Sequence, residues 1–264
     1  MSRALGDGGP APLRIAIIGS GSAAFAAAIR AGEGGAAVTI IESDELGGTC
    51  VNVGCVPSKI MIRAAHLAHL QHKHSFAGLD RHPIQVDRAA MVAQQQQRVS
   101  ELRSAKYADV LKSNPAIQLI HGRAQFHDAQ TLVVTQADGK QLEIAADRFL
   151  IATGRTPIVP GLSGLADTPF WTSTEALVAQ QLPEHLIVLG GSVVALELGQ
   201  AFLRLGSKVT LLSRSRLLPR EDAQLGTAMK QILTDEGMHV ITDCKVESVR
   251  HKNQQFEIET AHRR

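Results

Sequence analysis

Two short apolar runs, each followed at once by a glycine turn and a helix-like segment, constrain most strongly how this chain can fold. The first run is 14–18 and enters a turn at Gly19; the second is 186–189 and enters a turn at Gly190. Short runs rich in isoleucine and leucine, bounded by turns, are typical of buried parallel strands. A strand that leads through glycines into a helix is typical of α/β folds. The sequence therefore predicts one α/β plan that is built twice.

The remaining elements are predicted from the same patterns. In the first half we expect strands over 38–41, 117–124, 131–135, 141–145 and 149–152, with helices to about 31, over about 56–71 and over about 87–112. In the second half we expect helices over about 190–205 and 221–236, with strands over 208–212, 239–242, 245–250 and 256–260. Turn residues at 137–140 predict a hairpin. Each half should thus hold a parallel sheet and a small antiparallel meander.

The segment 47–59, GGTCVNVGCVPSK, places Cys50 and Cys55 five positions apart. A zinc knuckle needs a second ligand pair downstream, and a thioredoxin-type motif has two residues between its cysteines. The spacing instead favours a disulfide that opens and closes at the start of a helix, where the positive helix end stabilises a thiolate. Two unpaired buried cysteines are the alternative.

The first glycine turn has the pattern of a dinucleotide-binding fingerprint. Gly19 allows the tight turn, Gly21 lets the backbone approach a pyrophosphate, and the small Ala24 lets the helix pack on the strand. Glu42 ends the next strand, where a carboxylate accepts hydrogen bonds from ribose hydroxyls. A glycine-rich turn that only packs is the alternative.

The second turn has a serine, Ser192, in place of the second glycine, and the strand after it ends in arginine. Arg214 and Arg220 lie six positions apart, with Arg216 between them. An arginine at this position can bind the 2′-phosphate of NADPH through two parallel hydrogen bonds, whereas an acidic residue favours the free 2′-hydroxyl of NADH. We therefore expect NADPH rather than NADH; a solvated basic loop is the alternative.

Composition excludes several classes of function. The chain has 264 residues, a formal net charge of +2 and 3% aromatic residues, so we expect no nucleic-acid partner. It has three cysteines, too few for a secreted disulfide scaffold, and no long apolar stretch or signal peptide. The expected location is the cytoplasm, with no membrane partner.

Two dinucleotide sites beside one cysteine pair predict an electron path from a nicotinamide through a flavin to a disulfide. Lys59 follows Cys55 by about one helical turn, and Glu197 lies on the helix after the second glycine turn. These two could form an ion pair beside the flavin. Ordinary surface positions are the alternative for both.

Five stretches together resemble the flavin-dependent pyridine nucleotide–disulfide oxidoreductases: GSGSAA, IIES, GGTCVNVGCVPSK, LIATGR and GGSVVALELGQAF. The resemblance runs from about residue 14 to 260 and implies two Rossmann-like domains, one for FAD and one for NAD(P). Within the family, the stretches SKIMIRAAHLAHL, PFWTSTEAL and RLGSKVTLLSRS are most similar to the branch that reduces Hg(II) to Hg(0).

The resemblance also implies roles for individual residues. Cys55 would be the thiolate beside the flavin and Cys50 the sulfur that exchanges with substrate, and the two thiolates would bind Hg(II). Lys59 and Glu197 would pair beside flavin and nicotinamide. The residues that would bind the two cofactors are Gly19, Gly21, Ala24, Glu42, Asp44, Gly48, Thr49, Lys59, Ala124, Thr153, Gly154, Gly190, Ser192, Arg214 and Arg220. Cys244 is expected to be structural.

The chain also departs from the family. We expect residues 1–157 to form the first part of an FAD-binding domain, 158–182 a linker, and 183–264 an incomplete NAD(P)-binding domain. The C-terminal dimerisation domain and the N-terminal metal-binding domain are not recognisable, so the sequence reads as the N-terminal portion of a longer, homodimeric enzyme. Open alternatives are a disulfide reductase of the dihydrolipoamide dehydrogenase or glutathione reductase kind, and an inactive nucleotide-binding remnant.

Overall fold

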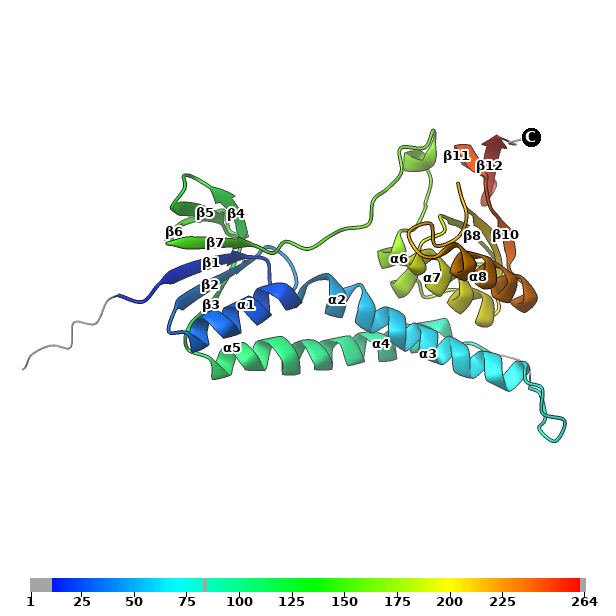
Figure 1. Ribbon diagram of the computed structural model, residues 1–264, viewed down its shortest axis with the longest axis horizontal. Helices are drawn as coiled ribbons and strands as arrows, with labels where there is room; N and C mark the ends of the chain where they lie inside the picture. Colours follow the sequence, from blue (N-terminus) through cyan, green and yellow to red (C-terminus); the bar gives the residue numbers. More distant parts are fainter. Residues whose placement is uncertain (1–10, 83–84, 262–264) are drawn as a thin grey trace, which may run out of the picture. The chain divides into compact units, whose positions relative to one another are not determined.

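The computed structural model describes residues 11–82 and 85–261 (Figure 1). These residues form two compact units. The first contains the chain up to Asn52 and Val99–Thr156, and the second contains Val53–Arg98 and the chain from Pro157 onward. The sequence assigns residues 53–98 to the FAD-binding domain instead, so the domain boundaries stay a prediction.

The first unit is built on a four-stranded parallel sheet in the order β3-β2-β1-β7. Its strands are β1 (Arg14–Ile18), β2 (Ala37–Glu42), β3 (Ile117–His121) and β7 (Arg148–Ile151). Ile17 lies opposite Ile40 in the register, and neither side chain is exposed. Parallel strands covered on both faces read as apolar runs, which is why the sequence locates these strands closely.

The two faces of this sheet are covered differently. Helix α1 (Ser22–Glu33) packs against β1, β2 and β3. The other face meets the antiparallel meander β4 (Arg123–Phe126), β5 (Thr131–Thr135) and β6 (Gln141–Ala145), with Leu132 and Val134 buried against Ala16 and Ile41 (Figure 1). The predicted strands 131–135 and 141–145 coincide with β5 and β6 of this meander.

The prediction of one strand over 117–124 is wrong, because the chain changes sheet at Gly122. That glycine has φ +156°, and its N–H donates to the Glu42 carbonyl at 2.8 Å. A Cβ there would lie 2.6 Å from Val134 Cγ1. The corner therefore requires a glycine, and it separates β3 from β4.

The predicted long helix is divided in the structure. It consists of α4 (Arg88–Arg103), a π-helical turn (Ser104–Ala108) and α5 (Asp109–Ser113). Tyr107 in the π turn packs edge-on against Phe25 of α1, with ring centroids 4.8 Å apart. The five-residue helix α2 (Gly48–Asn52) was not predicted, because it is too short to show a period.

The second unit holds the three-stranded parallel sheet β10-β9-β8. Its strands are β8 (His185–Leu189), β9 (Lys208–Leu212) and β10 (His239–Ile241), and its helices are α3 (Cys55–His72), α6 (Ser173–Val178), α7 (Val193–Arg204) and α8 (Ala223–Glu236). A short 3-10 turn (Leu165–Asp167) precedes α6. The predicted meander takes the form of a hairpin, β11 (Lys245–Lys252) with β12 (Gln255–Ala261).

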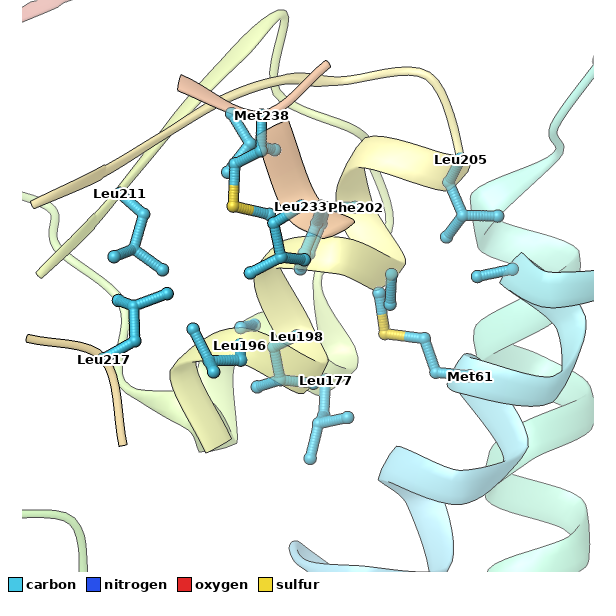
Figure 2. Close-up of a cluster of buried hydrophobic side chains, with 14 residues drawn as sticks. Met61, Leu177, Leu196, Leu198, Phe202, Leu205, Leu211, Leu217, Leu233 and Met238 are labelled. Carbon is cyan, nitrogen blue, oxygen red and sulfur yellow. The ribbon is translucent and has the colours of Figure 1, made fainter. Parts of the chain in front are cut away.

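One apolar cluster holds the second unit together (Figure 2). Phe202 of α7 is fully buried at its centre, and Leu211 of β9 and Leu233 of α8 pack in the same cluster. Met61 brings α3 into it. Helix α3, whose first residue is Cys55, is thus fixed to the helix that follows the second glycine turn. Within residues 11–82 and 85–261, no helix is long and apolar enough to span a bilayer.

Candidate functional site

The first glycine turn leaves β1 and enters α1 at its uncapped end. Gly19 has φ +103°, and a Cβ there would lie 2.3 Å from the carbonyl oxygen of Ala152. Gly21 is the residue before α1, and no side chain caps this helix end. The N–H groups of a first helical turn have no partner within the helix. The turn thus offers bare backbone donors at the positive end of α1.

Two further segments converge on this turn. A Cβ at Gly48 of α2, where φ is +66°, would lie 2.8 Å from the Cα atom of Gly21. Thr49 donates its hydroxyl proton to the carbonyl of Arg155 at 3.1 Å. A Cβ at Gly154 would lie 3.6 Å from the Thr49 hydroxyl oxygen. The structure thereby brings three distant stretches of predicted cofactor residues together.

Glu42 ends β2 beside this turn and is 9% exposed. One carboxylate oxygen accepts from the backbone N–H and the hydroxyl of Ser20, at 2.9 and 2.6 Å. The other accepts from the backbone N–H of Asp44 at 2.9 Å. Ser20 also accepts from the N–H of Gly47 at 3.1 Å. Ser20 was not among the residues predicted from the sequence; its position between Gly19 and Gly21 is the signal that could have identified it.

The other predicted residues of the first unit occupy three places. Ala24 is fully buried on α1, as a residue that packs helix on strand should be. Thr153 is exposed in the segment after β7 that contacts Gly19. Ala124 lies in β4, two residues after the corner at Gly122 that hydrogen-bonds Glu42. Their role in cofactor binding stays a prediction.

The two cysteines of the motif lie on different helices. Cys50 is partly exposed on α2, whereas Cys55 is exposed and is the first residue of α3. Gly54 precedes α3, and no side chain caps that end of the helix. The positive end of an 18-residue helix therefore lies at Cys55. In the part of the chain that the structure describes, no group of three or more His, Cys, Asp or Glu side chains is arranged to hold a metal ion.

The structure brings Lys59 and Glu197 together. The Lys59 Nζ atom of α3 lies 2.6 Å from Glu197 Oε1 of α7, with both side chains partly exposed. This pair was predicted from the sequence, and the contact between the two residues is present. Whether a flavin lies beside it is a separate prediction.

The second glycine turn joins β8 to α7. Gly190 has φ +128° and donates its N–H to the Leu212 carbonyl at 2.9 Å. Ser192 is the N-cap residue of α7, and its hydroxyl accepts from the Ala195 N–H at 3.4 Å. Gly191 is needed as well, because a Cβ there would lie 2.6 Å from the Ser213 hydroxyl. Ser192, which stands where the fingerprint has its second glycine, thus serves as the N-cap of α7.

The three arginines after β9 differ in what they contact. Arg214 and Arg220 are exposed. The guanidinium of Arg216 is directed at backbone carbonyls of its own loop. Arg214 and Arg220 are therefore the two placed to meet a ligand from solvent. Sequence spacing alone could not separate the three.

Comparison with known proteins gives a consistent result. Residues 13–264 match the family described as pyridine nucleotide-disulphide oxidoreductase. The protein named mercuric reductase from Shewanella putrefaciens is 54% identical over 247 residues, covering 93% of this chain and 44% of the relative. The mercuric reductase from Shigella flexneri is 52% identical over 260 residues, covering 97% of this chain and 46% of the relative. The chain spans about half the length of these curated relatives.

The fold is also found among solved structures. The HOCl-induced flavoprotein disulfide reductase RclA from Escherichia coli has a TM-score of 0.81 and 31% sequence identity to this chain. The alignment covers 95% of this chain and 53% of that structure. The two α/β units predicted from the two glycine turns are thus an arrangement of elements that a known flavoprotein disulfide reductase shares.

Proposed function

Because this chain belongs to the pyridine nucleotide-disulphide oxidoreductases, we propose that it is part of an NADPH-dependent flavoprotein that reduces Hg(II) to Hg(0) through Cys50 and Cys55. Membership of the family implies use of a flavin and a pyridine nucleotide. The observation that carries the proposal is the high identity, over nearly the whole chain, to relatives named mercuric reductase.

The first glycine turn fits the pyrophosphate of FAD. A side chain at Gly19 or Gly48 would meet backbone, so both positions remain free of side-chain atoms. The uncapped end of α1 supplies N–H donors for phosphate oxygens. Glu42 would accept hydrogen bonds from ribose hydroxyls, and Asp44, Thr49, Ala124, Thr153 and Gly154 would surround the cofactor. A bound flavin supplies an acceptor of hydride and a donor of electron pairs to sulfur.

The second glycine turn would hold NADPH. Its backbone at Gly190 and Ser192 precedes the 12-residue helix α7, whose positive end favours phosphate. Arg214 and Arg220 would contact the 2′-phosphate in forked geometry. Lys59 and Glu197 would pair beside the flavin and the nicotinamide.

Cys50 and Cys55 would hold the substrate. Two thiolates bind Hg(II) well, because soft sulfur ligands prefer soft metal ions. Reduction of Hg(II) to Hg(0) takes two electrons, and oxidation of one NADPH to NADP+ with loss of a proton provides two. The exposed Cys55 at the positive end of α3 suits the thiolate that remains in place, and Cys50 the sulfur that exchanges with substrate.

Three further properties belong to the same proposal. Residues 1–157 would form the first part of the FAD-binding domain and residues 183–264 part of the NAD(P)-binding domain, joined by 158–182. The polypeptide of the relatives' length would be a homodimer. Its location would be the cytoplasm, where thiols stay reduced between turnovers.

The test measures Hg(II)-dependent NADPH oxidation in the presence of excess thiol. It uses this chain, and also a polypeptide of the relatives' length that contains it. The variants are Cys50→Ser and Cys55→Ser, with Cys244→Ser as the matched control. We expect both motif variants to lose turnover while reduction of an artificial dye by NADPH remains, and the control to keep both activities.

Turnover that persists in Cys50→Ser and Cys55→Ser would overturn the proposal. Oxidation of NADPH by glutathione disulfide or lipoamide, with no response to Hg(II), would favour the disulfide-reductase alternative. Absence of bound flavin after purification of the longer polypeptide would favour an inactive nucleotide-binding remnant.

A further inference from the structure

Arg216 lies between the two arginines assigned to the 2′-phosphate, but its guanidinium binds the backbone. Nη1 donates to the carbonyls of Leu218 and Asp222 at 3.1 and 3.4 Å. Nη2 donates to those of Pro219 and Glu221 at 3.1 and 2.8 Å. One side chain thus links four carbonyl groups of residues 213–222, which we call the arginine loop.

The arginine loop is also packed closely against its surroundings. Leu217 is 1% exposed and belongs to the main apolar cluster of its unit. A Cβ at Gly226 of α8 would lie 2.4 Å from the Leu217 carbonyl oxygen, and a Cβ at Gly191 would lie 3.3 Å from the Leu217 Cα. Leu217 of the loop therefore lies between two glycines, Gly226 in α8 and Gly191 in the second glycine turn.

A hydrogen bond joins the loop to that turn. Leu218 donates its N–H to the Gly191 carbonyl at 2.8 Å. Leu218 has φ +48°, a left-handed conformation that is unfavourable for a residue with a side chain. Its carbonyl accepts from Arg216 and from the Glu221 N–H, at 3.1 and 3.0 Å. Hydrogen bonds at both its N–H and its carbonyl thus hold Leu218 in this unfavourable backbone conformation.

We propose that Arg216 is a positioning residue for nucleotide selectivity, which rests on the proposed function of Arg214 and Arg220. By closing the arginine loop, it fixes where the two exposed arginines stand relative to the glycine turn. Forked contacts to a phosphate demand accurate placement of the guanidinium groups. Loss of the Arg216 bonds should therefore weaken recognition of the 2′-phosphate, although Arg216 does not contact it.

The test measures binding of NADP+ and NAD+ to the 264-residue chain by titration calorimetry. In Arg216→Gln, we expect the dissociation constant of NADP+ to rise about tenfold and that of NAD+ to rise about threefold or less. Arg216→Lys keeps the positive charge but loses the fork, so it should behave like Arg216→Gln. Arg250→Gln, an exposed arginine of β11, is the matched control and should bind both nucleotides as the parent does.

A combined variant tests the route of the effect. If Arg216 acts through Arg214 and Arg220, adding Arg216→Gln to Arg214→Gln/Arg220→Gln should weaken NADP+ binding less than Arg216→Gln does alone. Full additivity, or parent-like selectivity in Arg216→Gln, would overturn the inference. Parent-like binding by Arg216→Lys alone would show that charge matters and position does not. A parent chain that does not prefer NADP+ to NAD+ would refute the proposed function itself, and this inference with it.

Discussion

Lys59 and Glu197 form an ion pair with 2.6 Å between Nζ and Oε1, which joins the helix that begins at Cys55 to the helix that follows the second glycine turn. They are 138 positions apart in the sequence. The pair is partly exposed, and the two helices, α3 and α7, are already held together by apolar contacts in the cluster that contains Met61 and Phe202. Its contribution should therefore concern function more than folding.

Replacing Glu197 by glutamine should separate these two contributions. Partly exposed ion pairs stabilise proteins by about 1 kcal/mol or less, so urea unfolding should change by no more than that. NADPH-dependent dye reduction should fall about tenfold, because Lys59 loses its fixed position. Lys112→Met, which removes an exposed pair with Asp109, is the control and should leave the activity unchanged. Equal activity in both variants would contradict the prediction.

Replacing Gly19 by alanine should be much more costly than the same change at Gly35. Both glycines have positive φ, which costs alanine about 1 kcal/mol. At Gly35 no heavy atom beyond the adjoining residues lies within 4 Å of the added Cβ, whereas at Gly19 the Ala152 carbonyl oxygen is 2.3 Å away. We expect losses in unfolding free energy of about 1 kcal/mol for Gly35→Ala and about 3 kcal/mol for Gly19→Ala. If urea denaturation gives similar losses of unfolding free energy for Gly19→Ala and Gly35→Ala, the backbone contact between Gly19 and Ala152 is not rigid and the prediction is wrong.

Arg88 should tolerate methionine but not alanine. Its side chain is buried, and Nη2 donates to the Leu177 carbonyl at 3.0 Å. Nε and Nη1 have no hydrogen-bond partner among the described residues, and burial lowers the pKa of the guanidinium. Gln95 also donates to Leu177, at 2.9 Å, so this carbonyl keeps a partner. Arg88→Met should therefore match or exceed the parent stability.

Arg88→Ala is the comparison variant, because it removes the same charge and leaves a cavity. It should lower the free energy of unfolding by about 2–3 kcal/mol in urea. If Arg88→Met is as unstable as Arg88→Ala, the buried charge stabilises the fold and the prediction is wrong.

His69 should make the fold sensitive to acid. Burial lowers its pKa from the usual 6.5, and the positive charges of Arg204 and Lys73 act in the same direction, against Glu236. The unfolded chain therefore binds a proton at a pH where the folded chain does not. Stability from this group is complete above pH 6.5 and is lost as the pH falls toward the folded pKa. In His69→Gln, unfolding free energies between about pH 7 and pH 5 should vary less with pH; an unchanged slope would contradict this.

Much of the fold could be predicted because its signals are local. The strand at Arg14–Ile18 matches the prediction residue for residue, since a strand buried on both faces has a continuous apolar run. The turn at Gly19 could be predicted because glycine there is needed for the backbone itself. The short helix at Gly48–Asn52 escaped prediction, because five residues show no period.

The sequence by itself determined two strand–turn–helix units, the cysteine pair, and the types of residue that ligands would meet. Only the tertiary structure decided that the chain changes sheet at Gly122, that Ser20 holds Glu42, and that Arg216 binds its own loop while Arg214 and Arg220 face solvent. Apolar periodicity and glycine conformation are local properties, so neighbouring residues reveal them. The hydrogen-bond partner of a carboxylate or a guanidinium depends on which backbone groups come within about 3 Å of it. Those distances are set only when the chain has folded and packed.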